Sequence, residues 1–381
     1  MNFTINQKIF CAVLARVQGI TTPRATMPIL ANVLLSASAF RPVLHVSACD
    51  LEVGYTTVVD CVAVDRPGSV TVPSKKLYEI VKAAPTGEII ITLDPKNDRV
   101  TVSAGTFVTI LAGLDSEDFP DFVLPSGSGF QLDAAALLQL IGHVDYAQAA
   151  DETKYNLCGT FFRIEDGDFG PRLFAVTTDG HRLAVDSVLL PGDPRVIPAD
   201  LVRGVIISRK GVAELKKIGR EGVLVLQISG NNLSVSTDNE TITLRLIDGE
   251  FPDYRKVIPT KFNGSITANR QPLIDALSRV AILAEGKMHP VTLEFAAGGV
   301  SLHSQSVDFG ESCDRISAVI EWHDSNQEPY TCKANAAYLV QALSTWDSIM
   351  VEIHVTDPMS PLQFSPEGDS EANAVIMPLR N

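Results

Sequence analysis

Apolar residues recur at helical spacing in two kinds of segment, and each kind occurs three times along the chain. The first kind covers residues 5–17, 133–144 and 270–282, each entered from a short strand-like run. Within these segments apolar side chains follow one another at intervals of three and four, which places them on one face of an amphipathic helix. The spacing therefore predicts one such helix near the start of each third of the chain.

The second kind of segment also follows a strand-like run. It covers residues 74–83, 208–220 and 333–343, again with apolar positions three and four apart. Ser74 and Ser208 stand where two of these helices would begin, and serine is a favoured residue for capping a helix N-terminus. We therefore predict a second amphipathic helix in each third, with these two serines as N-caps.

Alternating apolar and polar residues fill much of the remainder and predict half-buried strands. These runs are 44–47, 70–72, 89–93, 100–102, 224–228, 233–236 and 242–246. Short turns such as 95–98 and 230–232 join neighbouring runs, so the sheets are expected to be antiparallel. The segments 118–122 and 250–254 are similar to each other and stand where one repeat would end. The pattern predicts an α+β fold of three repeated domains, 1–125, 126–258 and 259–381, each with two helices on antiparallel sheets.

The formal net charge of −14 argues at first against nucleic acid, because duplex DNA repels an acidic surface. The charges are, however, sorted along the chain. The six helical segments contain thirteen basic residues and four acidic ones, so the rest of the chain is more acidic than the total. If the helices share one side of an assembly, that side is basic and the other is acidic.

Two basic pairs sharpen this interpretation. Lys75-Lys76 and Arg209-Lys210 occupy the first turns of two predicted helices, where the helix dipole disfavours cations by roughly 0.3–1 kcal/mol each. Folding does not require that placement. A solvated polar face is the plain alternative, but a surface that attracts phosphates without reading bases explains the repetition better.

Motifs for common chemistry are missing from the sequence. It contains no phosphate-binding glycine loop, no zinc-protease motif and no nucleophile elbow. The most enzyme-like stretch is Asp179-Gly180-His181-Arg182, which combines an acid with a potential base, but no nucleophile is identifiable beside them. Two rival hypotheses remain open: an enzyme that uses Asp179 and His181, and a repeat scaffold whose basic face binds only acidic proteins.

The ends and the hydropathy of the chain bear on its location. The sequence starts without a basic region followed by a long apolar run, so it does not predict a secretory signal. Apolar stretches stay well below the roughly 18 residues of a membrane span. We therefore expect a cytoplasmic protein that does not contact a membrane.

Several segments resemble the bacterial β sliding clamp family, the β subunits of DNA polymerase III. The segment 177–185, Thr-Thr-Asp-Gly-His-Arg-Leu-Ala-Val, is very similar to a family motif. Segments 26–32, 208–215, 248–255 and 377–380 also resemble family motifs, in the expected order. The resemblance spans essentially the whole chain and agrees with the three repeats.

This resemblance implies a non-catalytic processivity factor without cofactor or metal. Two copies would close head to tail into a ring around double-stranded DNA, with helices lining the hole. The implied partners are DNA polymerase, the clamp loader and other proteins that carry a clamp-binding motif. They would dock by that short motif in a hydrophobic pocket between the second and third domains.

The resemblance also implies which residues form each surface. Pocket positions are Leu157, Thr178, Gly180, His181, Arg182, Leu183, Pro252, Lys256, Val257, Met288, Asn335, Tyr338, Val375, Ile376, Met377, Pro378, Leu379 and Arg380. Candidate DNA-facing residues are Arg24, Lys75, Lys76, Lys154, Arg209 and Lys210, and candidate dimer residues are Phe107, Leu111, Ile282 and Leu283. The chain departs from the family at Lys256, where arginine is common, at Met288, where an aromatic residue is common, and in the segment 359–361.

Overall fold

A computed structural model describes residues 1–21, 27–120, 129–190, 197–286, 288–323, 330–369 and 371–380. The predicted DNA-facing residue Arg24 lies outside these described residues. Contacts within the chain group them into two compact units. Unit 1 holds the described residues of 1–134, 197–198 and 213–246, and unit 2 holds those of 135–190, 199–212 and 247–380.

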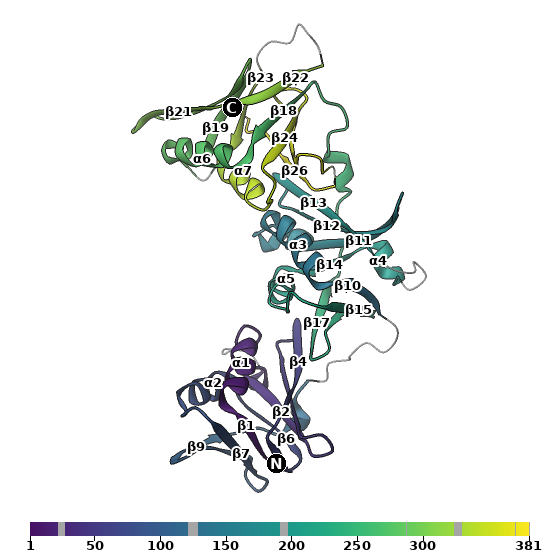
Figure 1. Ribbon diagram of the computed structural model, residues 1–381, viewed down its shortest axis with the longest axis vertical. Helices are drawn as coiled ribbons and strands as arrows, with labels where there is room; N and C mark the ends of the chain where they lie inside the picture. The colour runs from purple at the N-terminus through teal and green to yellow at the C-terminus, as the bar shows by residue number, and fades with distance from the viewer. Residues whose placement is uncertain are drawn as a thin grey trace. The chain divides into compact units, whose positions relative to one another are not determined.

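The helices occur where the apolar spacing predicted them (Figure 1). They are α1 (Gln7–Val17), α2 (Ser74–Ala83), α3 (Ala134–Val144), α4 (Ala199–Arg203), α5 (Arg209–Leu215), α6 (Arg270–Val280) and α7 (Ala336–Leu343). Helix α5 ends five residues earlier than the pattern suggested, and the short helix α4 was not predicted.

All seven alternating runs that predicted strands lie within strands of the first two repeats. They are β1 (Asn2–Asn6), β2 (Asn32–Ser38), β3 (Val43–Cys49), β4 (Val53–Asp60), β5 (Ala63–Arg66), β6 (Gly68–Pro73), β7 (Glu88–Asp94), β8 (Arg99–Ala104), β9 (Phe107–Ala112), β10 (Phe130–Asp133), β11 (Gly159–Gly167), β12 (Gly170–Thr178), β13 (Arg182–Leu189), β14 (Val205–Ser208), β15 (Val223–Ser229), β16 (Asn232–Ser236) and β17 (Glu240–Ile247).

The third repeat continues the same plan. Its strands are β18 (Gly264–Asn269), β19 (Pro290–Ala296), β20 (Gly299–Ser306), β21 (Gly310–Ile316), β22 (Ala318–Trp322), β23 (Tyr330–Asn335), β24 (Met350–Val355), β25 (Leu362–Pro366) and β26 (Asn373–Ile376). In all three repeats a strand leads directly into the first helix, and another leads into the second. The α+β class and the threefold repetition are therefore confirmed.

Unit 1 contains two antiparallel sheets. One has the order β5-β1-β7-β8-β9. The other runs β10-β15-β16-β17-β4-β3-β2-β6, so β17 of the second repeat pairs with β4 of the first. Helices α1 and α2 pack against each other and against strands of this second sheet. The two repeats are thus joined by backbone hydrogen bonds along a shared sheet.

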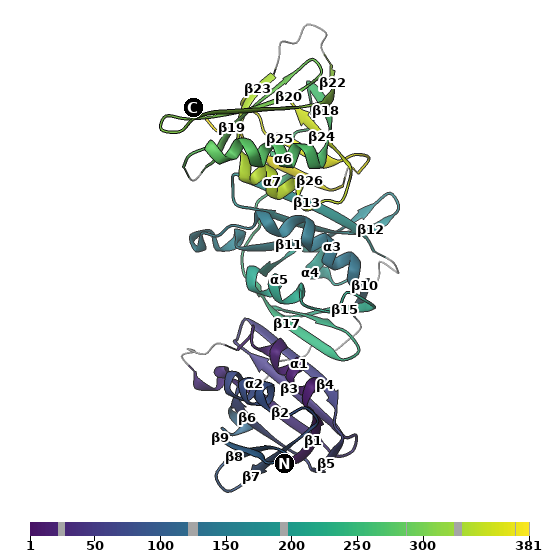
Figure 2. The ribbon, with the colours of Figure 1, turned by 60° about the vertical axis from the view of Figure 1, so that its left-hand side comes forward.

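Unit 2 is joined in the same way. Its larger sheet runs β14-β11-β12-β13-β26-β25-β24-β18-β22, with β13 of the second repeat beside β26 of the third. Its smaller sheet has the order β21-β20-β19-β23. Figure 2 shows α6 and α7 side by side on one face of the third repeat, and the two helices are in contact. Because each sheet of the second repeat is shared with a neighbour, the contact units differ from the three predicted domains, whose boundaries stay a prediction.

The two predicted N-caps differ in outcome. Ser208 accepts a hydrogen bond on its Oγ from the Gly211 backbone N–H at 3.1 Å, so it caps α5 as predicted. The prediction for Ser74 is wrong, because Ser74 is the first residue inside α2 and Pro73 stands at the cap. The Ser74 hydroxyl instead accepts from the Gln18 side chain at 2.9 Å, which ties α2 to the end of α1.

Candidate functional site

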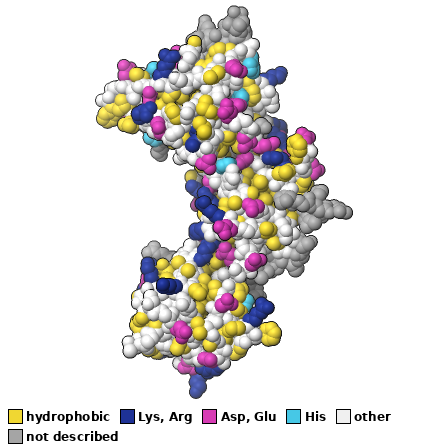
Figure 3. Space-filling model, in the orientation of Figure 1, with side chains coloured by type: hydrophobic (Ala, Val, Ile, Leu, Met, Phe, Trp, Pro, Cys, Tyr) yellow, Lys and Arg dark blue, Asp and Glu magenta, His cyan; other side chains and the backbone are white. Residues whose placement is uncertain are grey.

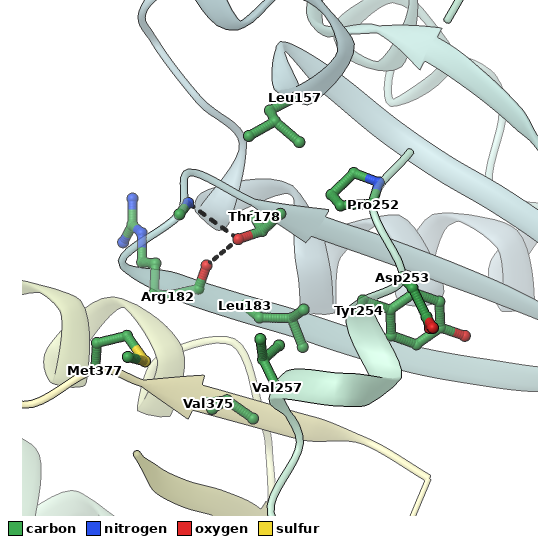
Figure 4. A pocket seen from close by; sticks show the side chains of 11 residues that line it. Leu157, Thr178, Arg182, Leu183, Pro252, Asp253, Tyr254, Val257, Val375 and Met377 are labelled. Carbon is green, nitrogen blue, oxygen red and sulfur yellow. Dashed lines mark hydrogen bonds between the residues drawn. The ribbon is translucent and has the colours of Figure 1, made fainter. Parts of the chain in front are cut away.

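A cavity of about 220 Å³ lies in unit 2, where the second and third repeats meet. Its lining is mostly apolar (Figure 4). The lining residues are Leu157, Thr178, Gly180, Arg182, Leu183, Pro252, Asp253, Tyr254, Val257, Val375 and Met377. Such a cavity suits apolar side chains, with a few polar groups at its margin to orient them.

Strand pairing forms one wall of this pocket. Strands β13 and β26 run antiparallel, and their register sets Leu183 opposite Val375. Both side chains are buried. Beyond the strand, the Met377 N–H donates to the His181 carbonyl at 2.9 Å, so the sheet-like pairing continues to the pocket mouth. The wall therefore exists only while the third repeat is paired with the second.

The turn 178–182 forms a second wall, and its polar groups hold one another. The Thr178 hydroxyl donates to the Arg182 carbonyl at 2.6 Å and accepts from the Gly180 N–H at 3.1 Å. Asp179 Oδ1 accepts from the N–H groups of His181 and Arg182 at 2.9 and 3.1 Å. Gly180 has a φ of 92°, a conformation that favours glycine.

The contacts within this turn bear on the hypothesis of an enzyme that uses Asp179 and His181. Both oxygens of Asp179 are engaged within the turn, since Oδ2 accepts from Arg182 Nε at 3.0 Å. His181 is exposed and contributes its backbone carbonyl to the pocket wall. The stretch thus has a structural explanation that needs no catalysis.

Arg182 is the most constrained polar residue of the pocket. Besides Asp179, its guanidinium donates to the Tyr146 carbonyl at 2.7 Å and to the Gln341 side chain. It also lies over the Tyr338 ring, 4.1 Å from the ring centroid. Its side chain is only 10% exposed. Burial raises the pKa of the Tyr338 phenol, so the ring stays neutral beside the cation. Arg182 therefore joins α7 of the third repeat to the turn of the second.

The segment 252–257 forms the remaining wall. Tyr254 is buried, and Val257 is 46% exposed at the pocket. The Asp253 carboxylate pairs with the Lys256 ammonium at 3.1 Å, outside the apolar interior. Asp253 and Tyr254 are absent from the residues predicted for the pocket. The similarity between segments 118–122 and 250–254 marked this stretch, but it gave no reason to place it beside a cavity.

The structure brings half of the predicted pocket residues together at the cavity. Those that line it are Leu157, Thr178, Gly180, Arg182, Leu183, Pro252, Val257, Val375 and Met377. The predicted residues that do not line it are His181, Lys256, Met288, Asn335, Tyr338, Ile376, Pro378, Leu379 and Arg380.

Several residues of the second group have other contacts nearby. Asn335 caps α7, since its Oδ1 accepts from the Ala337 N–H at 2.9 Å. The Leu379 N–H donates to the Lys333 carbonyl at 2.7 Å and fixes the end of the chain. Ile376 is buried in the core of the third repeat, whereas Met288 is 54% exposed.

The basic residues predicted to face DNA lie on the helices and at the pocket turn. Lys75 and Lys76 are exposed in the first turn of α2, and Lys76 pairs with Glu79 at 2.8 Å. Arg209 is exposed at the start of α5, beside the half-buried Lys210. The Lys154 ammonium donates to the Asp179 carbonyl at 3.1 Å. Figure 3 shows basic side chains over the α1–α2 pair and over α5.

Arg16 does not belong to this basic surface, although its helix position suggested that it would. Its Nη1 lies 2.5 Å from Glu214 Oε2, and the Arg16 and Glu214 side chains are 14% and 3% exposed. The guanidinium also lies over the Tyr55 ring at 4.7 Å. The pair joins α1 of the first repeat to α5 of the second, so its charges compensate each other inside unit 1.

The residues predicted for the dimer lie at the ends of two sheets. Phe107 and Leu111 are half-buried on β9, the terminal strand of its sheet. In the third repeat, Ile282 is 79% exposed and Leu283 half-buried, next to the sheet that ends in β21. Strand edges with exposed apolar residues favour pairing with another chain.

The described residues contain no group of three or more His, Cys, Asp or Glu side chains placed to hold a metal ion. None of their helices is both long and apolar enough to cross a membrane.

The sequence matches family models along nearly its whole length. Residues 1–125, 131–253 and 255–380 match the N-terminal, central and C-terminal domains of the DNA polymerase III beta subunit, respectively. The chain is 30% identical to a beta sliding clamp of Pseudomonas putida over 383 residues and 31% identical to one of Caulobacter vibrioides over 388 residues. Each alignment covers 100% of both chains.

Solved structures give the same result. The fold is similar to the DNA polymerase III subunit beta of Pseudomonas aeruginosa, with a TM-score of 0.89 and 28% identity. It is also similar to a sliding clamp of Bartonella birtlesii bound to griselimycin, with a TM-score of 0.91 and 30% identity. Both comparisons cover 100% of each chain. The chain therefore belongs to the beta sliding clamp family, the β subunits of DNA polymerase III, and is a non-catalytic processivity factor that tethers the polymerase to DNA.

Proposed function

We propose that two copies of this chain close head to tail into a ring around duplex DNA, and that the pocket of unit 2 holds a short motif of its protein partners. The partners would be DNA polymerase, the clamp loader and other proteins with the same motif. The protein would act in the cytoplasm, at the nucleoid. The pocket is the observation that carries this proposal, because it is the apolar, partly open cavity that peptide docking requires.

The pocket residues would have different roles in binding the motif. Leu183, Val257 and Val375 offer an apolar surface for an aliphatic or aromatic side chain of the motif. Arg182 is fixed by its own partners, so it provides a rigid wall and needs no ordering when a peptide binds. Tyr338 lies under the Arg182 guanidinium, and Pro378, Leu379 and Arg380 follow the pocket residue Met377 along the chain. They would contact the part of the motif that extends from the pocket.

The basic helix residues support the DNA part of the proposal. Lys75, Lys76, Arg209 and Lys210 occupy first helical turns against the helix dipole, as a phosphate-attracting surface would require. Lys154 adds a cation at the pocket turn. A ring held by topology needs only weak contacts of this kind, because strong contacts with phosphates would slow sliding along DNA.

Edge strands support the closure of the ring. Strand β9 in one copy would pair with β21 in the other, with Phe107 and Leu111 against Ile282 and Leu283. Such an interface joins different surfaces of the two chains, and it closes when two copies complete a circle. It would also cover two edges that otherwise expose unpaired backbone groups.

The pocket assignment is tested by removing residues 377–381. We expect this truncated chain to lose binding to the polymerase, because Met377 lines the pocket and Leu379 anchors the chain end. The dimer should persist, as measured by solution mass. A control variant, Met359→Ala, changes a 60% exposed methionine outside the pocket and should bind normally. Unchanged polymerase binding after truncation contradicts the assignment.

Ring closure is tested by solution mass over a range of protein concentrations. A closed ring predicts a dimer with no larger species. Substitution of Ile282 by Asp should yield monomers, because a charge would be buried in the proposed interface. A monomer for the unmodified chain at micromolar concentration contradicts ring closure by two copies.

A further inference from the structure

A second, polar cleft of about 430 Å³ lies in unit 2 and shares residues Pro252, Asp253 and Tyr254 with the apolar pocket. The rest of its lining differs. It is formed by Phe161, Arg163, Arg203, Gly204, Gly249, Glu250, Phe251 and Arg255. The segment 252–254 is therefore a partition with an apolar cavity on one side and a polar cleft on the other.

The base of the cleft is rigid and aromatic. The rings of Phe161 and Phe251 are stacked, with centroids 4.8 Å apart and planes within 8° of parallel. Gly204 has a φ of 102°, and a Cβ atom there would lie 2.3 Å from the Phe161 ring. Position 204 therefore requires glycine, and its backbone packs directly on the aromatic base.

Three arginines surround this base. The side chains of Arg203, Arg255 and Arg163 are 81%, 52% and 38% exposed. Glu165 neutralises part of this charge, because its carboxylate pairs with Arg255 and lies 3.4 Å from Arg163 Nε. Among the described residues, Arg203 pairs with the Asp200 carboxylate, whose Oδ1 lies 3.8 Å from Arg203 Nη1.

Two more carboxylates line the cleft, and their negative charge opposes the binding of an anion. Asp253 pairs with Lys256 at 3.1 Å, so its charge is compensated outside the cleft. Glu250 is exposed at the rim, and its backbone carbonyl accepts a hydrogen bond from the Asn156 side chain at 2.9 Å. The Arg203 guanidinium is the most exposed of the three and is not paired with Glu165, so it is the arginine best placed to attract an anion.

A buried hydroxyl also faces this side of the partition. Tyr254 is 7% exposed, and its hydroxyl has no hydrogen-bond partner among the described residues. Figure 4 shows the hydroxyl directed away from Leu183 and Val257, hence away from the apolar pocket. Burial, together with the Glu165 carboxylate, raises the pKa of this phenol, while the guanidiniums of Arg255 and Arg163 oppose the shift. The Arg255 guanidinium lies close to the hydroxyl but does not form a well-directed hydrogen bond with it. A buried donor without a partner is costly unless a ligand or water satisfies it.

We propose that this cleft is a second subsite for the same partners, and that it takes a carboxylate of the peptide next to the motif held in the pocket. Arginine forks bind carboxylates in two-pronged geometry, and the Tyr254 hydroxyl can donate a further hydrogen bond. The carboxylate is either an acidic side chain flanking the motif or the end of a peptide chain. This inference rests on the proposed function, because it needs the motif in the adjacent pocket.

The test uses matched fluorescent peptides and the full-length protein. Each contains the clamp-binding motif of the replicative polymerase, a four-residue Gly-Ser linker and a tail of three aspartates or three asparagines. The linker spans up to about 13 Å when extended. In one pair of peptides the tail is at the amino end of the motif, and in the other pair it is at the carboxyl end. A further peptide without a tail ends in a free carboxylate or an amide directly after the motif.

We expect one acidic peptide to bind roughly three- to tenfold more tightly than its neutral twin at low salt. The advantage should fade as salt is raised, because exposed charges are screened. The variant Arg203→Gln should abolish the difference and leave the affinity of the asparagine-tailed peptide unchanged. The control Lys261→Gln removes an exposed cation outside the cleft and should keep the preference.

Two outcomes overturn the inference in distinguishable ways. If every acidic peptide binds no better than its neutral twin, or if the preference persists in Arg203→Gln, the subsite is refuted while the pocket stands. If the neutral peptides do not bind at all, the proposed docking pocket fails, and the subsite fails with it.

Discussion

The two junctions between repeats, one within each unit, are built alike but differ in which repeat supplies the carboxylate of their ion pair. In unit 1, β17 pairs with β4, and Arg16 lies over Tyr55 while paired with Glu214. In unit 2, β13 pairs with β26, and Arg182 lies over Tyr338 while paired with Asp179. Both junctions thus combine a shared sheet with an arginine held between a carboxylate and an aromatic ring.

The difference lies in the origin of the carboxylate. Glu214 comes from the neighbouring repeat and is 3% exposed, so the ion pair crosses the junction and is buried there. Asp179 comes from the same turn as Arg182 and leaves a cavity of about 220 Å³ beside the arginine. One way of joining repeats therefore yields a buried ion pair that spans the junction in unit 1, and a local ion pair beside a cavity in unit 2.

The largest expected effect is at the junction of unit 1, where the ion pair is buried. Replacing Glu214 by Ala should destabilise unit 1 by about 3–5 kcal/mol, because it leaves the buried Arg16 charge without its partner. The loss is measured as faster hydrogen exchange in α1 and a lower midpoint in urea. Lys217→Ala is the matched control, since Lys217 also contacts Glu214 at 2.5 Å but is 46% exposed. Equal losses for the two variants contradict a buried pair as the basis of this junction.

A somewhat smaller effect is expected at the junction of unit 2. Arg182→Ala removes the bonds to Asp179, Gln341 and the Tyr146 carbonyl and should cost about 2–3 kcal/mol of stability in unit 2. Arg182→Lys should recover little of it, because an ammonium cannot reproduce the planar fork. The loss is measured as a lower midpoint of urea unfolding and as faster hydrogen exchange in α7. Full recovery by lysine means that charge alone matters at this position.

Motif binding in the pocket can be weakened without changing the contacts that join the repeats. Val257→Asp places a carboxylate at an apolar wall and should weaken motif-peptide binding by at least about tenfold, as measured by fluorescence anisotropy. Val319→Asp is the matched control, because Val319 is 62% exposed and outside the cavity. If both variants bind the peptide equally well, the cavity is not the docking site.

The smallest effect is expected from the basic helix surface. The double variant Lys75→Gln and Lys76→Gln should reduce the salt dependence of binding to linear duplex DNA by a slope of about 2, since each phosphate contact contributes about 0.9. Changing Lys96 and Lys261 to Gln removes the same charge elsewhere and should leave the slope unchanged. An unaltered slope in the first variant removes α2 from the proposed DNA surface.

Local patterns predicted the elements of this fold well. The three- and four-residue spacing located six helices, because burial of one helix face is a local property of the sequence. The prediction of Ser208 as an N-cap is confirmed, whereas the prediction for Ser74 is wrong because Pro73 stands at the cap. The apolar spacing does not fix the first residue of a helix, and a shift of one residue changes whether a serine caps it.

Contacts between distant segments were the part that the sequence did not reveal. Arg16 was counted among the thirteen basic residues of the helical segments, and its pairing with Glu214, 198 residues away, was not foreseen. Asp253 and Tyr254 were missed because the cavity depends on the pairing of β13 with β26, which no local pattern encodes. The polar cleft behind Tyr254 had no sequence signal, since Arg163, Arg203 and Arg255 are separated along the chain.

The central claim is that the chain works as a closed ring held on DNA by topology. Its most direct test loads the protein onto nicked circular DNA with the clamp loader, and then cuts the circle once. A ring should stay bound to the circle at moderate salt and be lost from the linear DNA by sliding off the ends. Protein that remains equally bound after cutting contradicts the account.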